Sequence, residues 1–148
     1  VAYCQPFRDM DDIKIREIIN VNVSGLIMMT KHMLPLMQEG MIINISSGLG
    51  KRGCPGYAAY CASKFAVVGF TEALAGELKK IRVVAVCPGG VDTDMYHSVP
   101  SGRPWLKPEH IASKILEICS KPQKFRSGSA VEVYCVTDAL AYLKRRYL

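Results

Sequence analysis

Two short runs of mostly apolar residues constrain the fold of this chain more than any other feature. Residues 41–46 read Met-Ile-Ile-Asn-Ile-Ser, and residues 81–87 are dominated by Val and Ile. Strands that read as near-continuous apolar runs are buried on both faces, as in parallel sheets covered by helices on both sides. Because segments with helical patterning separate the two runs, the sequence predicts an α/β fold with a doubly wound parallel sheet.

The remaining segments supply the other elements of this architecture. Apolar spacing and breaker residues define them, with Asp9 or Asp11 available as the N-cap of the first helix. No internal repeat or linker is visible, so residues 1–148 predict a single domain. The predicted elements are helices over 11–37, 57–80 and 108–120, strands over 41–46, 81–87 and 130–136, and loops over 48–56 and 94–106.

The second predicted helix is apolar on all sides. Between residues 57 and 78 its charged side chains are Lys64, Glu72 and Glu77. A helix with no polar face must be buried on more than one side, so one face can lie on the sheet while another needs a partner. The first helix is similarly rich in Ile, Val, Leu and Met. We therefore expect a homodimer or homotetramer that associates through the helices 11–37 and 57–80.

Charge and hydropathy exclude several classes of protein. The chain has 19 Lys and Arg against 13 Asp and Glu, a net charge of +6, but the basic residues are scattered and cluster only at Lys144-Arg145-Arg146. There is no basic run with interleaved aromatics, so we expect a solvated basic surface rather than a nucleic-acid interface. No stretch is apolar enough for a membrane helix and no signal-peptide pattern is seen, which favours a cytoplasmic protein.

The cysteines give no metal or disulfide signature. There are six, none in a C-x-x-C pair and none with a His at zinc-ligand spacing, so no metal site is expected. We expect reduced thiols, as in a reducing compartment. The cysteines are Cys4, Cys54, Cys61, Cys87, Cys119 and Cys135.

Tyr60 and Lys64 form the first candidate catalytic pair. Their i, i+4 spacing places them on one face of the second helix. A phenol with an ordinary pKa of about 10 is a poor proton donor or acceptor near neutrality. A neighbouring ammonium would lower that pKa and make Tyr60 a usable general acid or base. By itself this spacing is common enough to arise by chance.

Two strand ends add further polar groups at the same edge of the sheet. Ser46 and Ser47 end the strand 41–46 and should point in opposite directions, and the spacing to Tyr60 favours Ser47 as the residue that faces the crevice. The strand 81–87 ends in Pro88-Gly89-Gly90-Val91-Asp92-Thr93. This turn would let the backbone approach a flat ligand, and the Thr93 hydroxyl would be available to it. A simple turn is the alternative.

Asn22 interrupts the first helix within Val21-Asn22-Val23-Ser24-Gly25. Asn and Ser compete with the backbone for hydrogen bonds, so a local bulge or bend is expected here. A buried helical Asn that only satisfies its own hydrogen bonds is the alternative.

Taken in order and spacing, Asn22, Ser47, Tyr60-x-x-x-Lys64 and the run 88–93 resemble the short-chain dehydrogenase/reductase family. Residues 43–47 and the Ala- and Gly-rich second helix share the resemblance, which extends from about residue 1 to 136. It implies a Rossmann-like fold and reversible hydride transfer between NAD or NADP and a carbonyl or secondary alcohol. Ketoreductases, including the 3-oxoacyl type, and alcohol dehydrogenases carry out this reaction.

The resemblance also implies a role for each matched residue. Tyr60 would exchange a proton with the substrate oxygen, and Ser47 would hydrogen-bond the same oxygen. Lys64 would lower the pKa of Tyr60 and bind the nicotinamide ribose, and Asn22 would hold a water in a proton relay. Tyr60, Lys64, Pro88, Gly89, Val91 and Thr93 would be the residues that contact the cofactor.

The sequence departs from the family pattern before Asn22. The glycine-rich turn T-G-x-x-x-G-x-G, whose helix N-terminus receives the pyrophosphate, is not found there. The residues that choose between NAD and NADP are absent with it. In addition, 79–82 would pass from helix to strand without a turn residue. We therefore expect the chain to be part of a longer protein, with residues omitted before residue 1 and at this junction.

Two alternatives follow from these departures. A chain that really is this short would hold a three-stranded sheet with an exposed apolar edge and would be a non-catalytic interaction module of the same descent. An extended-type sugar epimerase shares the Tyr and Lys pair, but the Ser47 context and the Pro-Gly-Gly run favour a reductase.

Substrate preference is indicated only by the loop 94–106, which the resemblance implies is the substrate lid. Its mostly apolar or aromatic surface would suit a hydrophobic carbonyl compound, including an acyl chain, and His97 is expected to be a surface residue rather than a catalyst. The side chains concerned are Met95, Tyr96, Val99 and Trp105, with Arg103 nearby.

Overall fold

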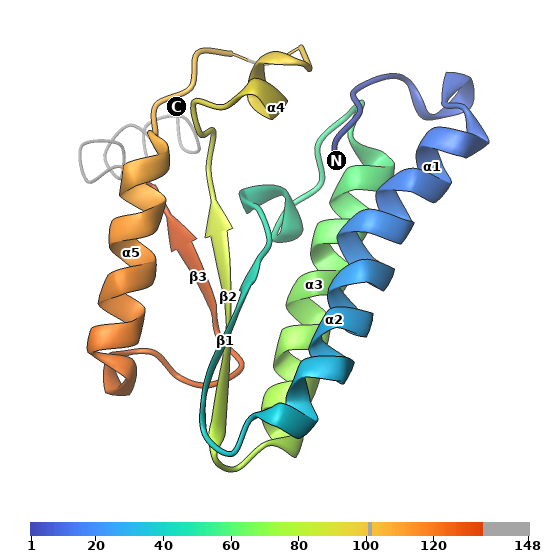
Figure 1. Cartoon of the computed structure of the whole chain (residues 1–148). Helices are drawn as coiled ribbons and strands as arrows, with labels where there is room; N and C mark the ends of the chain where they lie inside the picture. Colours follow the sequence, from blue (N-terminus) through green and yellow to red (C-terminus); the bar gives the residue numbers. More distant parts are fainter. Residues whose placement is uncertain (101, 135–148) are drawn as a thin grey trace.

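A parallel sheet forms the centre of the computed structural model, which describes residues 1–100 and 102–134. The described part contains strands β1 (Gly40–Ile45), β2 (Ile81–Pro88) and β3 (Ala130–Val133), in the order β1-β2-β3 (Figure 1). All pairs are parallel, with Gly40 opposite Ile81 at one end of the first pair and Pro88 opposite Val133 at one end of the second. The predicted α/β fold with a parallel sheet is confirmed.

Helices cover both faces of this sheet. The helices α1, α2 and α3 lie on one side and α5 on the other (Figure 1). Val84 and Val86 of β2 pack with Ile118 of α5 and Val133 of β3 in one core cluster. Successive strand residues point to opposite faces, so Val83, Ala85 and Cys87 face the α3 side. All of these β2 side chains are fully buried, which is why this strand carries no alternating pattern.

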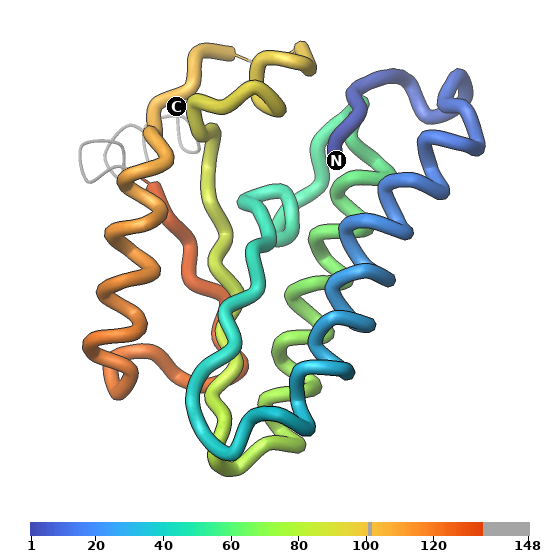
Figure 2. Tube along the Cα trace, in the orientation of Figure 1, coloured from blue at the N-terminus to red at the C-terminus, as the bar shows by residue number. Residues whose placement is uncertain are grey.

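The predicted helix 11–37 is one rod interrupted at the expected place (Figure 2). It consists of α1 (Asp12–Ile19), a π-helical segment (Asn20–Gly25), α2 (Leu26–Met33) and a 3₁₀ turn (Leu34–Leu36). Asp11 is the N-cap, and its carboxylate accepts a hydrogen bond from the Ile13 N–H at 2.8 Å. The irregularity predicted around Asn22 is therefore confirmed as a π-helical segment.

The predicted end of the second helix is wrong. Helix α3 (Ala58–Glu77) ends at Glu77 rather than at residue 80, and residues 78–80 connect it to β2. A connection of this length is ordinary between a helix and a strand. The apparent lack of a turn at 79–82 suggested that residues were omitted there. That reason no longer holds, because Leu78, Lys79 and Lys80 form the turn.

The segment after β2 is more regular than a loop. A short helix, α4 (Asp94–His97), forms within the predicted loop 94–106, and Thr93 caps it. Helix α5 (Pro108–Ser120) begins at Pro108 as predicted. Two 3₁₀ turns that the sequence did not predict also form, Phe7–Asp9 and Pro122–Lys124. The predicted strand 130–136 is β3 in its first part, and Cys135, residue 136 and the cluster 144–146 lie outside the described residues.

The described residues show neither a membrane-spanning helix nor a group of metal ligands. None of the helices in 1–100 or 102–134 is long and apolar enough to cross a membrane. Across the same residues, no group of three or more His, Cys, Asp or Glu could hold a metal ion, and Cys4, Cys54, Cys61, Cys87 and Cys119 are free thiols.

Candidate active site

Tyr60 and Lys64 lie in the first turns of α3, where the helix runs beside the end of β1. Tyr60 is only 6% exposed, and Lys64 is half-buried. The Lys64 ammonium lies 5.7 Å from the centroid of the Tyr60 ring. It also donates a hydrogen bond to the Ile45 carbonyl oxygen at 3.2 Å. The end of β1 therefore holds the lysine over the tyrosine.

Ser47 follows β1 and reaches the same tyrosine. Its side chain lies within hydrogen-bonding reach of the Tyr60 hydroxyl, which lowers the pKa of that phenol. The Ser47 hydroxyl also accepts a hydrogen bond from the Leu49 N–H at 3.1 Å. The Ser46 hydroxyl instead donates to the Lys64 carbonyl oxygen at 2.8 Å. The two serines thus have separate partners, as their positions in an extended strand require.

Gly50 lets this turn approach helix α3. A Cβ on Gly50 would lie 2.7 Å from the Lys64 carbonyl oxygen, closer than side-chain carbons come to backbone oxygens. The 3₁₀ turn Gly48–Gly50, which Ser47 caps, is therefore in direct contact with α3. A larger residue at position 50 would push Ser47 away from Tyr60.

Burial sets the electrostatics of the pair. Desolvation raises the pKa of Tyr60 above its ordinary value, and the hydrogen bond from Ser47 offsets this only in part. Desolvation also lowers the pKa of Lys64. The sequence led us to expect a net lowering of the Tyr60 pKa by Lys64, and the structure gives the opposite direction. Both groups lose solvation of their charged forms on burial, and this loss is the largest cause of each shift.

Asn22 belongs to the same network through Ser63. The Asn22 amide donates to the Ser63 hydroxyl at 3.1 Å, and Ser63 donates to the Tyr60 carbonyl oxygen at 2.7 Å. Asn22 also exchanges hydrogen bonds with Val1, whose nitrogen donates to it at 2.9 Å. Sequence reasoning missed Ser63, although a serine within a helix that is apolar all round is a signal for a buried polar contact.

The residues expected to contact a cofactor follow the end of β2. Pro88 pairs with Val133, and Val91 forms an isolated bridge with Leu106. The Thr93 hydroxyl accepts a hydrogen bond from the Tyr96 N–H at 3.3 Å and thereby caps α4.

Gly89 is needed for packing within the chain itself. A Cβ on Gly89 would lie 3.0 Å from the Tyr134 ring and 3.2 Å from the Trp105 ring. We expected a flat ligand to approach the backbone freely here. On the side where a Cβ would point, the Tyr134 and Trp105 rings occupy that space. The turn after β1 lies close by, because a Cβ on Gly48 would be 3.4 Å from the Pro88 carbonyl oxygen.

Tyr57 connects the predicted lid to helix α3. Its hydroxyl donates to the Pro100 carbonyl oxygen at 3.0 Å, and its ring meets the Tyr60 ring edge to face with centroids 6.3 Å apart. His97 is an exposed residue that hydrogen-bonds Asp92 at 2.7 Å, as expected for a surface position. Sequence reasoning missed Tyr57 because its partner is 43 residues away.

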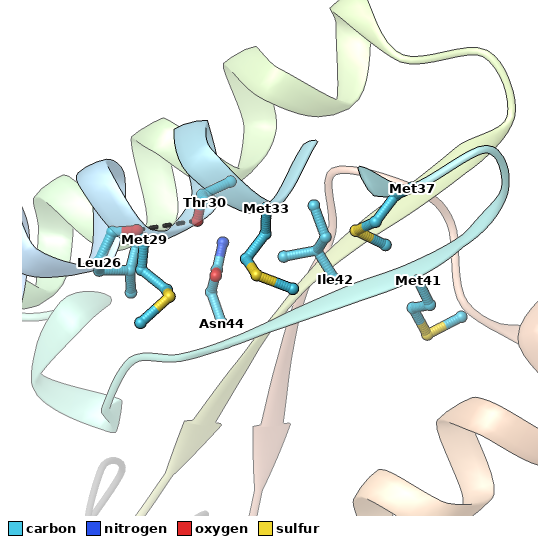
Figure 3. A pocket seen from close by; sticks show the side chains of 8 residues that line it. All are labelled: Leu26, Met29, Thr30, Met33, Met37, Met41, Ile42 and Asn44. Carbon is cyan, nitrogen blue, oxygen red and sulfur yellow. Dashed lines mark hydrogen bonds between the residues drawn. The ribbon is translucent and has the colours of Figure 1, made fainter. Parts of the chain in front are cut away.

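A separate groove of about 480 Å³ lies between α2 and β1 (Figure 3). Its lining is mostly apolar and contains four methionines, and none of Asn22, Ser47, Tyr60 and Lys64 contributes to it. It therefore belongs to the face beside β1 and not to the candidate site. The lining residues are Leu26, Met29, Thr30, Met33, Met37, Met41, Ile42 and Asn44.

Known sequences of one protein family match most of this chain. The sequence profile of the family described as short chain dehydrogenase matches residues 1–104. A 3-oxoacyl-(acyl-carrier-protein) reductase of Thermotoga maritima is 35% identical over 133 residues, which cover 78% of this chain and 54% of that protein. Alcohol dehydrogenase 1 of Ceratitis capitata is 38% identical over 125 residues, covering 78% and 48%.

Comparison with solved structures agrees. The 3-ketoacyl-(acyl-carrier-protein) reductase of Brucella melitensis, solved with NADH, aligns with a TM-score of 0.80 at 32% identity and covers 89% of this chain and 61% of that one. A short chain dehydrogenase of Escherichia coli CFT073, solved with NADPH, aligns with a TM-score of 0.81 at 29% identity, covering 88% and 57%. The chain spans about half the length of the curated relatives it matches. On this sequence match and this fold, the chain belongs to the short-chain dehydrogenase family of oxidoreductases.

Proposed function

We propose that this chain carries the catalytic residues of a nicotinamide-dependent reductase or dehydrogenase that interconverts a carbonyl and a secondary alcohol. One observation supports this most directly: the Lys64 ammonium lies over the Tyr60 ring, and a hydrogen bond from Ser47 lowers the pKa of the same tyrosine. These groups gather beside the end of β1. The carboxyl edge of a parallel sheet is where α/β folds of this kind bind ligands.

Tyr60 would act as the general acid in reduction. Because burial raises its pKa, the phenol stays protonated and can donate to a carbonyl oxygen that gains negative charge. In the reverse direction the phenolate would accept the alcohol proton. Ser47 would donate its hydrogen bond to the same oxygen and so stabilise charge that develops in the transition state.

The Lys64 ammonium has N–H groups that can donate hydrogen bonds to a cofactor. An ammonium group has three N–H donors, and one is directed to Ile45 among the contacts of the described residues. We propose that a ribose hydroxyl of the nicotinamide half takes another, and that Tyr60, Pro88, Gly89, Val91 and Thr93 border this half. When bound, NAD or NADP supplies or accepts the hydride. Relatives solved with NADH and with NADPH support the cofactor class and leave both dinucleotides open.

Asn22 would connect Lys64 to solvent through a water molecule, as the resemblance implies. Its burial and its π-helical position would support this role, because a π segment turns a side chain out of the regular helix register. In the structure its amide is held by Ser63 and Val1, so it is also a structural residue.

The substrate would be a hydrophobic carbonyl compound or its alcohol. Met95 and Trp105, which flank the end of β2, are 47% and 38% exposed and offer apolar surface to a ligand. Relatives named as 3-oxoacyl reductases and as alcohol dehydrogenases suggest two substrate classes to compare, a 3-oxoacyl thioester and a small secondary alcohol.

We also propose that the protein is a homodimer or homotetramer that associates through the helices 11–37 and 57–80. Large apolar side chains are exposed along these helices, including Ile13 at 72%, Met29 at 66% and Phe65 at 46%. Light scattering of the purified protein should give a multiple of the chain mass, and Phe65→Glu should lower it. A monomeric wild-type mass would refute the association.

A cytoplasmic location is part of the same proposal. Five cysteines in the described part of the chain are free thiols, as expected in a reducing compartment. Cell fractionation should recover the protein with cytoplasmic markers, and secretion would contradict this assignment.

The decisive test compares Tyr60→Phe with Tyr3→Phe in the purified protein. The oxidation of NADH and of NADPH is followed with 3-oxoacyl and simple ketone substrates. Tyr60→Phe should abolish turnover with cofactor affinity nearly intact, because the ring remains and only the hydroxyl that would exchange the proton is lost. Tyr3→Phe removes an exposed hydroxyl that bonds Glu17 and should leave turnover unchanged. Substantial turnover by Tyr60→Phe would reject the role, and binding of neither dinucleotide would favour a non-catalytic interaction module.

A further inference from the structure

Helix α3 carries two buried hydroxyl groups, and each accepts a hydrogen bond from a buried asparagine on a neighbouring segment. Ser63 accepts from the Asn22 amide at 3.1 Å, and Thr71 accepts from the Asn44 amide at 2.9 Å. Both hydroxyl residues are 0% exposed. They are separated by about two helical turns, or about 12 Å along the axis. The Ser63 pair lies beside Tyr60, whereas Asn44 lines the separate groove beside β1 (Figure 3).

Each of these hydroxyls gives its single proton to the main chain of α3. Ser63 donates to the Tyr60 carbonyl oxygen at 2.7 Å, and Thr71 donates to the Val67 carbonyl oxygen at 2.8 Å. A hydroxyl has one proton and two lone pairs, so it can only accept a hydrogen bond from its asparagine. Ser63 therefore requires Asn22 to present its NH₂ group to α3 and to turn its side-chain oxygen away.

The Asn22 side chain is thereby held in one orientation. Its amide also donates to the Val1 carbonyl oxygen at 2.8 Å, and its oxygen accepts from the Val1 nitrogen at 2.9 Å. A side-chain carbonyl oxygen can accept two hydrogen bonds, so this oxygen has capacity for one more donor. The water that Asn22 is proposed to hold near Lys64 would be that donor.

We propose that Ser63 is a positioning residue for the proton relay of the proposed oxidoreductase. Its hydroxyl fixes the orientation of the Asn22 side chain and ties that side chain to the turn of α3 that carries Tyr60. The inference rests on the proposed function, because the relay is the path by which a proton would return to Tyr60 after each reduction. Asn44 and Thr71 have the same chemistry away from that path, so they only stabilise the fold.

Ser63→Ala and Thr71→Val form a matched pair, because each removes one buried hydroxyl that bonds an asparagine and a carbonyl oxygen of α3. Carbonyl reduction is followed in H₂O and in D₂O with the dinucleotide that supports turnover. Ser63→Ala should lower kcat by about 10-fold to 100-fold and change KM by less than about twofold. Its D₂O effect on kcat should exceed that of the wild type, because return of the proton becomes slow. Thr71→Val should keep the wild-type kcat and D₂O effect.

Urea unfolding provides a second measurement that needs no turnover. Ser63→Ala and Thr71→Val should both lower the unfolding midpoint, since each leaves a buried asparagine amide without its partner. The midpoint loss of the double variant Asn22→Ala with Ser63→Ala should be smaller than the sum of the two single losses, because each change breaks the same hydrogen bond. The losses from Asn22→Ala and Thr71→Val should add. Ser63→Thr, which keeps a hydroxyl, should retain a higher kcat than Ser63→Ala.

The role of Ser63 is overturned if Ser63→Ala keeps the wild-type kcat and D₂O effect, or if Thr71→Val loses as much kcat as Ser63→Ala. Additive midpoint losses for Asn22→Ala and Ser63→Ala would overturn it independently of turnover. The two proposals fail in different ways. Substantial turnover by Tyr60→Phe would reject both, whereas an inactive Tyr60→Phe beside a fully active Ser63→Ala would reject the role of Ser63 alone.

Discussion

The ammonium of Lys64 lies 5.7 Å from the centroid of the Tyr60 ring, one helical turn along α3. The Ile45 carbonyl oxygen holds the ammonium there, so the strand end and the helix together fix the position of the lysine relative to the tyrosine. Both side chains are largely withdrawn from water. Burial raises the pKa of Tyr60 and lowers the pKa of Lys64, so the neutral form of each group is favoured. The arrangement therefore keeps Tyr60 as a phenol, which is the form that can donate a proton to a carbonyl.

Titration of Tyr60 should show this shift directly. Its pKa lies above the ordinary value of about 10, because the buried phenolate is poorly solvated. Tyr60 should therefore stay protonated as the pH rises through the range in which exposed tyrosines ionise. In protein with no nucleotide added, the phenolate absorbance lost in Tyr60→Phe should appear at a higher pH than that of a tyrosine with the ordinary pKa. A difference signal that appears below the ordinary range would contradict the direction given by burial.

Ser47→Ala should affect both the titration and the rate. The Ser47 hydrogen bond lowers the Tyr60 pKa, so its loss should move that pKa further upward. Loss of one donor to a developing oxyanion typically costs about 100-fold to 1,000-fold in kcat. Ser46→Ala is the matched control, because its hydroxyl bonds the Lys64 carbonyl oxygen and not Tyr60. Equal kcat values for Ser47→Ala and wild type would remove Ser47 from the site.

Asn22→Ala should destabilise the protein. The side chain is buried and bonds Ser63 and Val1, so its loss leaves polar groups without partners at a cost of about 1–3 kcal/mol. Asn20→Ala is the control, since Asn20 is an exposed residue of the same π-helical segment and should change stability by less than about 0.5 kcal/mol. Urea unfolding measures both variants. Identical midpoints would show that the Asn22 network does not hold the fold.

Tyr57→Phe should loosen the segment after β2 while leaving Tyr60 in place. The variant keeps the ring contact with Tyr60 and removes the hydroxyl that donates to the Pro100 carbonyl oxygen. Amide hydrogen exchange over residues 94–100 should become faster, and KM for a hydrophobic substrate should rise more than kcat falls. Unchanged exchange in this segment would mean that the hydrogen bond does not hold it.

The sequence predicted the elements that local pattern controls. The mostly apolar runs at 41–46 and 81–87 identify strands of a parallel sheet, and Asn22 among β-branched and small residues marks an irregular helix. The spacing to Tyr60 distinguished Ser47 from Ser46, although both follow the same strand. For the strands and for Asn22 the signal lies within a few residues of the feature, whereas for Ser47 it lies 13 residues away, at Tyr60.

The remaining features depend on residues that are distant in the sequence. The end of α3 at Glu77 could not be predicted from 78–80, because Leu and Lys are good helix formers and only the return to β2 ends the helix. The Tyr57 contact with Pro100 joins segments 43 residues apart. The direction of the Tyr60 pKa depends on burial by packed elements, so the spacing to Lys64 alone led to the wrong sign.

Fluorescence titration of the purified, mass-verified protein with NADH and with NADPH shows whether it binds a nicotinamide cofactor. A nicotinamide bordered by Tyr60, Lys64 and the end of β2 would be shielded from water, and its emission should change to a saturable limit with at least one of the two dinucleotides. A folded protein that leaves the emission of both unchanged would contradict the oxidoreductase proposal. In that case Tyr60 and Lys64 would be structural residues of an interaction module.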